Sequence, residues 1–251
     1  MTTIRRRILA VLPALLFAVA CSDSPGSPDA DQQLNLDVAN YVADMTSDDL
    51  YMFDLYSGMT ASPALASPPH PPRFFDLTIT RDVTFYDEFG AEQAAYDPLL
   101  TAEINFLFHM EGSHSRTGEM GSIDVAVNRD RDMWLSGLLG EETERLWNGT
   151  GSSAVSRSRI SDEKGDRQYD MSSSTVVENV LIQLPRFENP WPVSGTITRQ
   201  VHVEIVTDEG TVVEDRTVVI TFDGDQFVTI TVNGEEFELD LAQRCARRHH
   251  K

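Results

Sequence analysis

The chain has 251 residues, of which 40 are acidic and 20 are basic, so its formal net charge is −20 at pH 7. Such a chain repels polyanions, which excludes nucleic acid and anionic lipid surfaces as broad partners, because both are bound by clustered Lys and Arg side chains. Two cysteines are too few for a disulfide framework, so a hydrophobic core must stabilise the fold.

Residues 1–20 have the order of an export signal. Three arginines at positions 5–7 precede an uncharged apolar run, 8–20, which is too short to cross a bilayer core about 30 Å thick as a lasting helix. Cys21 follows this run directly, and residues 22–28 are mostly Ser, Pro and Gly. The pattern predicts a segment that is removed after export. Its removal takes away arginines and no acid, so the mature chain is more acidic still.

This arrangement resembles the signal sequence and lipobox of bacterial lipoproteins. The resemblance covers residues 1–21 and implies that Cys21 is acylated and becomes the first residue of the mature chain. Two or three acyl chains would anchor the protein firmly to a membrane of the cell envelope, whereas a single chain binds reversibly. Ala18, where lipoproteins more often carry leucine, also fits an ordinary signal peptidase site together with Val19 and Ala20. Cleavage at that site would leave Cys21 as a plain N-terminal thiol.

A helical segment and a linker are expected after a flexible tether over residues 21–33. Apolar residues recur at steps of three and four over 34–59, which predicts an amphipathic helical region. The polar tripeptide 47–49 predicts an interruption that caps a second short helix, which Gly58 would end. The prolines over 60–73 predict a stiff extended linker.

A β domain is expected over residues 74–241, followed by a solvated basic tail over 242–251. Apolar residues alternate here with Thr, Ser and charged residues, as in antiparallel sheets that have one wet face. We count about nine to eleven strands from their alternation and turn signals. Because so little helix is available to cover them, the sheet must curl or fold on itself. The expected fold class is therefore mainly β, an antiparallel meander that forms either a sandwich or an open half-barrel.

The register is most clearly predicted near the C-terminus. Asn233-Gly234 predicts a two-residue hairpin, in which Val232 faces Glu235, Ile230 faces Phe237 and Val228 faces Leu239. The apolar faces of the two strands then coincide. The strand before them joins the same dry face across a three-residue turn, Asp223-Gly224-Asp225.

The motifs that carry chemistry in other proteins are weak here. Ser161–Lys164 matches S-x-x-K, but it lies in a polar turn and lacks the partner motifs. The spacing of His109, Glu111 and His114 is not a recognised zinc pattern, and His109 and His202 lie on the polar faces of their strands. The Asp-rich segments 130–132 and 223–225 read as turns with too few oxygens for tight calcium binding. We assign no catalytic residue, metal ligand or cofactor, and enzyme activity is unsupported.

Two further residues are candidates for contacts. Trp191 lies in the rigid segment Asn189-Pro190-Trp191-Pro192 and is the best single contact residue, with core packing as the alternative. If Cys21 is acylated, Cys245 in the tail either stays free or pairs with another chain.

We therefore expect an envelope lipoprotein that is anchored by its lipid and acts without catalysis, by binding or structural support. In one version, the half-barrel holds a hydrophobic ligand on its dry face beneath the helix, as envelope lipid carriers do. In another, the core is filled and an exposed surface meets another protein. A hydrolase whose site is assembled from residues distant in sequence is the third alternative.

Overall fold

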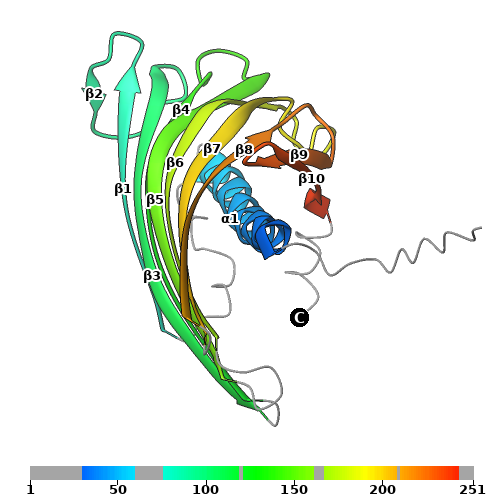
Figure 1. Ribbon diagram of the computed structural model, residues 1–251. Coiled ribbons are helices and arrows are strands. Elements are labelled where there is room, and N and C mark those ends of the chain that lie inside the picture. The colour runs from blue at the N-terminus through cyan, green and yellow to red at the C-terminus, as the bar shows by residue number, and fades with distance from the viewer. Residues whose placement is uncertain (1–29, 60–75, 119–120, 161–166, 208–209, 243–251) are drawn as a thin grey trace, which may run out of the picture.

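The computed structural model describes residues 30–59, 76–118, 121–160, 167–207 and 210–242, which form one helix and one sheet (Figure 1). The ten strands pair in the order β10-β9-β8-β7-β6-β5-β4-β3-β1-β2, and every pairing is antiparallel. The elements are α1 (Ala30–Met59), β1 (Asp76–Asp87), β2 (Glu92–Gln93), β3 (Thr101–Gly118), β4 (Gly121–Ser136), β5 (Glu144–Ile160), β6 (Arg167–Gln183), β7 (Ser194–Thr207), β8 (Gly210–Thr221), β9 (Phe227–Val232) and β10 (Glu235–Asp240).

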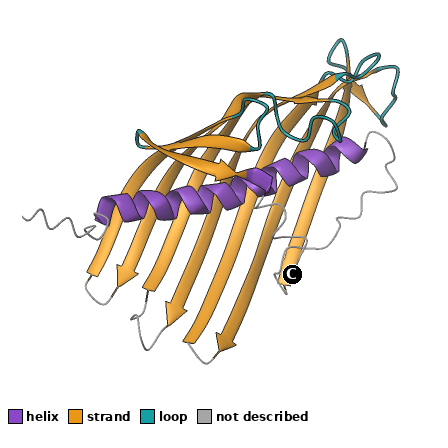
Figure 2. Ribbon diagram, turned by 90° about the vertical axis from the view of Figure 1, so that its right-hand side faces the viewer, coloured by secondary structure: helices purple, strands orange, loops and turns teal. Residues whose placement is uncertain are grey.

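The sheet curves around the helix as an open half-barrel. Figure 1 shows the long strands bending around α1, and Figure 2 shows α1 running across the strands on the concave face. Of the two expected architectures, the open half-barrel is therefore the one that forms. A second sheet is not needed, because α1 covers the dry face of the single sheet.

The strands have one dry and one wet face, as their alternation predicts. Along β6, the odd-numbered residues from 171 to 177 are buried on the concave face and the even-numbered ones between them are exposed on the convex face. Apolar side chains from the strands meet α1 in one core, and Val83 and Phe85 of β1 pack against it. Its buried members include Val38, Val42, Phe53, Ile104, Phe106, Leu135, Trp147, Ile182, Ile197, Ile220 and Ile230.

The predicted C-terminal hairpin is confirmed pair by pair. Val232 faces Glu235, Ile230 faces Phe237, and Val228 faces Leu239. In the preceding strand β8, Ile220 faces Ile230 across the turn that contains Asp223-Gly224-Asp225, so the three strands share their dry face.

Helix α1 is continuous, so the predicted interruption at residues 47–49 is wrong. Thr46 donates a hydrogen bond to the carbonyl of Val42 at 2.8 Å, and Ser47 donates one to the carbonyl of Ala43 at 3.0 Å. These hydroxyls bond within the helix instead of capping a new one, because their side chains turn back toward the preceding turn. Asp49 is buried against the sheet and has arginine partners there.

The N-terminal half of α1 is held by a polar contact with β8 and β10. Arg216 of β8 donates a hydrogen bond from Nε to Oδ1 of Asn35 at 2.8 Å, and Asn35 donates one to Glu235 of β10 at 2.9 Å. The helix begins at Ala30 rather than at residue 34. In the described part of the chain, no helix is both long and apolar enough to span a membrane.

Candidate functional site

The four most exposed large apolar side chains of the described residues, those of Phe89, Leu99, Phe187 and Leu100, lie in loops at one end of the sheet. Strands β1, β4 and β6 all end there, and the loops over 88–100, 137–143 and 184–193 lead from them to the next long strand at the top of Figure 1. We call the following five side chains, with their exposed fractions, the apolar rim: Phe89 (85%), Leu99 (83%), Leu100 (57%), Leu139 (42%) and Phe187 (83%).

Local hydrogen bonds fix the loop that carries three of these side chains. The carboxylate of Asp87 accepts hydrogen bonds from the backbone N–H groups of Phe89 at 2.9 Å and Ala91 at 2.8 Å. Gly90, between them, has φ of 77°, a conformation that glycine adopts without steric cost. The Asp97 carboxylate accepts a hydrogen bond from Leu99 N–H at 2.8 Å. The apolar tips are therefore presented by ordered turns, in which aspartate side chains replace backbone partners.

The rim is acidic as well as apolar. Arg186 is the one basic residue in residues 88–100, 137–143, 184–193 and 222–226, whereas these segments hold the acids Glu88, Glu92, Asp97, Glu141, Glu142, Glu188, Asp223 and Asp225. A hollow of about 330 Å³ opens beside Leu139 and is lined in part by Glu103, Glu141 and Glu144. A partner surface at the rim would therefore meet apolar tips surrounded by negative charge.

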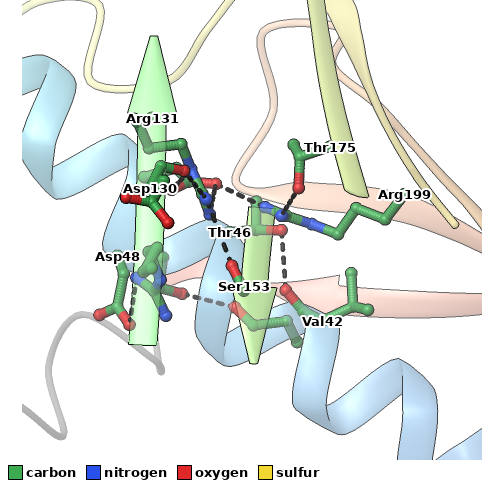
Figure 3. A network of polar contacts seen from close by, with 12 residues as sticks. Val42, Thr46, Asp48, Asp130, Arg131, Ser153, Thr175 and Arg199 are labelled. Atoms are coloured by element: carbon green, nitrogen blue, oxygen red, sulfur yellow. Dashed lines mark hydrogen bonds and ion pairs between the residues drawn. The ribbon is translucent and has the colours of Figure 1, made fainter. Parts of the chain in front are cut away.

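A second candidate site, which is polar, lies buried between α1 and the concave face. Figure 3 shows it from close by. Asp49 accepts hydrogen bonds from Nε of Arg131 on β4 at 3.1 Å and from Nη2 of Arg199 on β7 at 2.5 Å. Arg129, also on β4, donates to Asp48 at 3.2 Å. We call Arg129, Arg131 and Arg199 the arginine cradle.

Burial and charge oppose each other at Asp49. Removal from water would by itself raise the pKa of the Asp49 carboxyl, but the charges of Arg131, Arg199 and Arg129 outweigh this effect and hold that pKa at about 2. A carboxylate with such a low pKa is a poor general base, and guanidinium groups do not give up their protons. The geometry therefore suits holding the helix on the sheet and does not suit proton transfer.

Short side chains on the two middle strands make room for the cradle. Arg131 and Arg199 project from β4 and β7, whereas Gly151 of β5 and Thr175 of β6 lie between them in register. A Cβ atom on Gly151 would lie 2.6 Å from Cδ of Arg131, so the arginine side chain lies directly over this glycine. Long arginines on the flanking strands and small residues on the middle strands thus let the guanidiniums converge.

Trp191, the contact residue predicted from the sequence, is not the most exposed aromatic side chain of its loop. Trp191 is half-buried and packs against the core, whereas Phe187 in the same loop is exposed. Contact through Trp191 stays a prediction. Phe187 lies between two charged residues, a pattern that is typical of a buried position, so the sequence does not indicate that its side chain is exposed. Cys21, Cys245 and Ser161–Lys164 lie outside the described residues.

The histidines are divided between the two faces of the sheet. His109 on the convex face pairs with Asp130 at 2.8 Å, whereas His114, five residues along β3, belongs to the opposite face. The two histidines therefore cannot share one metal ion. In the described residues, no group of three or more His, Cys, Asp and Glu side chains is close enough to hold a metal ion.

The hydroxyl next to the His109 pair is Ser152, which donates to Asp130 at 3.4 Å. The carboxylate thus lies between imidazole and hydroxyl. Activation of a serine nucleophile needs the imidazole in the middle position, so this is not a catalytic triad. His202 forms a similar exposed pair with Asp215 at 2.7 Å.

The two Asp-rich segments differ in structure. Residues 130–132 are not a turn, as the sequence suggested, but the middle of β4, with Arg131 buried and Asp130 exposed on the other face. Residues 223–225 do form a turn, in which the Asp223 carboxylate accepts the N–H of Asp225 at 3.1 Å. Turn formation accounts for these aspartates.

Comparison of the chain with protein-family models, with curated proteins and with solved structures finds no match in any of the three. The apolar rim and the arginine cradle are therefore the features that bear on function.

Proposed function

We propose that this protein is a lipid-anchored lipoprotein of the bacterial cell envelope that binds another protein through its apolar rim and has no catalytic role. The order of the export signal and Cys21 supports the anchor. One observation supports the binding role above all: five large apolar side chains protrude from ordered loops at one end of the sheet. Several large apolar side chains exposed at one end of a folded protein are typical of interaction surfaces.

The free energy of binding at the rim depends on the apolar surface area that becomes buried. Each large apolar side chain that passes from exposed to buried contributes about 1.5–3 kcal/mol. Part of this gain is offset by the lost freedom of the two partners. Rigid presentation reduces that cost, and the Asp87 and Asp97 turns provide it for three of the five rim residues.

The charge of the rim selects the class of partner. The acids beside the apolar tips attract Lys and Arg side chains and repel an anionic bilayer surface. The hollow beside Leu139, with Glu103, Glu141 and Glu144 in its lining, suits a basic side chain of the partner. A basic protein surface with apolar pockets fits these properties better than a membrane does.

The structure gives less support to the alternative of a lipid carrier. Helix α1 lies on the face that a carrier would need for its ligand, as Figure 2 shows. Phe53 of the helix stacks on Trp147 of β5 with ring centroids 4.7 Å apart, and Phe106 contacts the same indole with a centroid distance of 5.6 Å. Side chains of the protein itself thus occupy the place of the ligand.

The anchor is tested by growing cells with a clickable fatty acid and isolating the full-length protein. We expect the wild type to be labelled and Cys21→Ala to be unlabelled, with Cys245→Ala as the control that keeps its label. Label on Cys21→Ala, or an unmodified exported protein whose two cysteines are joined, would contradict the anchor.

The rim is tested by placing a photo-crosslinking amino acid at Phe187 or Leu99 of the anchored protein in cells. A matched control carries it at Thr150, which is exposed on the convex face of β5. We expect one discrete protein adduct from the rim positions and none from Thr150. The double variant Leu99→Ser with Phe187→Ser, combined with a crosslinker at Phe89, should reduce the adduct at least tenfold. Equal adducts from Thr150, or lipid adducts only, would contradict the proposal.

A further inference from the structure

Four buried polar atoms lie at the contact between α1 and the sheet. Nε of Arg129 and Nε of Arg199 have no hydrogen-bond partner among the described residues, and the hydroxyls of Tyr41 and Ser173 have none except each other. Buried polar groups in proteins nearly always have a partner, which is a bound water or ion where no protein group provides one. This cluster therefore points to a small bound species.

These four atoms belong to one part of the concave face. Ser173 of β6 lies in register with Ser153 of β5, which lies in register with Arg129 of β4. Arg199 of β7 faces Thr175, two residues from Ser173 on the same face of β6. From the helix side, burial raises the pKa of the Tyr41 hydroxyl, and the charges of Arg129 and Arg199 and a hydrogen bond with Ser173 oppose this effect, so all three side chains lie close to that hydroxyl.

The charge of the cradle is not balanced. In the ion pairs of the described residues, three guanidiniums face two carboxylates, those of Asp48 and Asp49. Arg129 and Arg199 each have side-chain exposures of 5% or less, so water does not screen the excess of one positive charge. The pKa of Arg131 is lowered, first by burial and also by the neighbouring positive charges of Arg129 and Arg199, whereas Asp48 and Asp49 outweigh burial at Arg129 and raise its pKa. One monovalent anion would remove the excess.

We propose that a small monovalent inorganic anion of the chloride type binds between α1 and strands β4, β6 and β7. Its ligands are the N–H groups at Nε of Arg129 and Arg199 and the O–H groups of Tyr41 and Ser173. All four groups donate hydrogen bonds, as a spherical anion requires. None of these four residues belongs to the apolar rim, so this inference does not depend on the proposed protein binding.

The experiment measures thermal unfolding of the full exported chain at constant ionic strength, with chloride replacing gluconate, a much larger and non-spherical anion. An anion that binds only the folded state raises the melting temperature with its concentration. We expect a rise of about 3 °C between 1 and 100 mM chloride, and a similar rise with bromide. Constant ionic strength keeps general screening of the acidic surface unchanged.

Variants show whether the effect belongs to this site. Tyr41→Phe with Ser173→Ala removes two donors but leaves the arginines, and it should lose at least half of the chloride-dependent rise. Ser174→Ala, which lies on the exposed face of the same strand, is the matched control and should keep the full rise. Bromide-soaked crystals should show an anomalous peak between Ser173 and Arg199. Equal melting temperatures in chloride and gluconate, the same rise in both variants, or a water molecule in place of bromide would overturn the proposal.

Discussion

At the scale of single residues, Asp49 has the most important contacts in the molecule. Its carboxylate bridges Arg131 and Arg199, which come from strands three positions apart in the sheet. A buried charge that loses its partner is strongly unfavourable, whereas the paired group is tolerated. The helix is therefore held in one position on the sheet by a contact that apolar packing alone would not specify.

Replacing the carboxylate of Asp49 should destabilise the fold. We expect Asp49→Asn to lower the free energy of unfolding by about 3–5 kcal/mol, because two buried guanidiniums lose their counter-charge. Urea unfolding measures the change. Asp44→Asn, an exposed acid on the same helix, is the control and should change stability by about 0.5 kcal/mol or less. Equal effects of the two substitutions would contradict the importance of the network.

The same carboxylate predicts a pH dependence. The folded-state pKa of Asp49, about 2, lies below its ordinary value of 3.8, so its contribution is present above about pH 4 and is lost as the pH falls towards 2. We expect the stability difference between the wild type and Asp49→Asn to shrink by about 2 kcal/mol between pH 4 and pH 2. Taking the difference cancels the titration of the other acids. A constant difference across this range would show that the pKa is not lowered.

At the scale of elements, the bend of the sheet depends on local irregularities. The register between β6 and β7 shifts between Glu178 and Leu181, and Asn179 at the shift has a positive φ of 53°. The N–H of Asn179 donates to Asn148 on β5 at 2.8 Å, which holds the irregular backbone in place. Such bulges bend a strand and increase its twist, and curvature of this kind is what lets the sheet enclose α1.

Gly195 is the residue that this bulge requires. It has φ of 104°, and a Cβ atom there would lie 2.3 Å from the carbonyl oxygen of Asn179. We expect Gly195→Ala to be about 2 kcal/mol more destabilising than Gly90→Ala, measured by urea unfolding. Gly90 is the matched control, because it also has a positive φ but has no atom near its Cβ position. Equal losses would mean that the close approach has no consequence.

At the scale of the whole molecule, one helix replaces the second layer of a sandwich. Because α1 fills the concave face, we predict that gently purified protein carries no lipid other than its covalent anchor. Native mass spectrometry should give the mass of the polypeptide plus the anchor. A stoichiometric non-covalent lipid would restore the carrier alternative and would require α1 to move away from Trp147.

The sequence allowed the strands and their wet faces to be predicted, because alternation is a local property. The hairpin at Asn233-Gly234 followed from two adjacent residues and was correct to the pair. Alternation does not show what covers the dry face, so the sequence pattern fits a sandwich and a half-barrel equally well. The position of α1 on the concave face distinguishes them.

The errors at residues 47–49 and 130–132 have one common cause. Both segments are locally polar, and polar runs usually indicate caps and turns. Here Asp49 and Arg131 are polar because they pair with each other across the interior, and Arg199, 150 residues from Asp49, completes the contact. No pattern within a short window contains that information. The rim was missed for a related reason, because exposure of an apolar loop residue depends on what the rest of the fold leaves uncovered.

The long separation between Asp49 and Arg199 also sets an order of events during biosynthesis. Each strand from β3 onwards pairs with its neighbour in the chain, so the sheet can grow one hairpin at a time as the polypeptide emerges. Helix α1 emerges first, yet its arginine partner on β7 arrives much later. The helix that precedes all the strands is therefore among the last elements to be completed, and its apolar stripe lacks its final cover until β7 and β8 have been made.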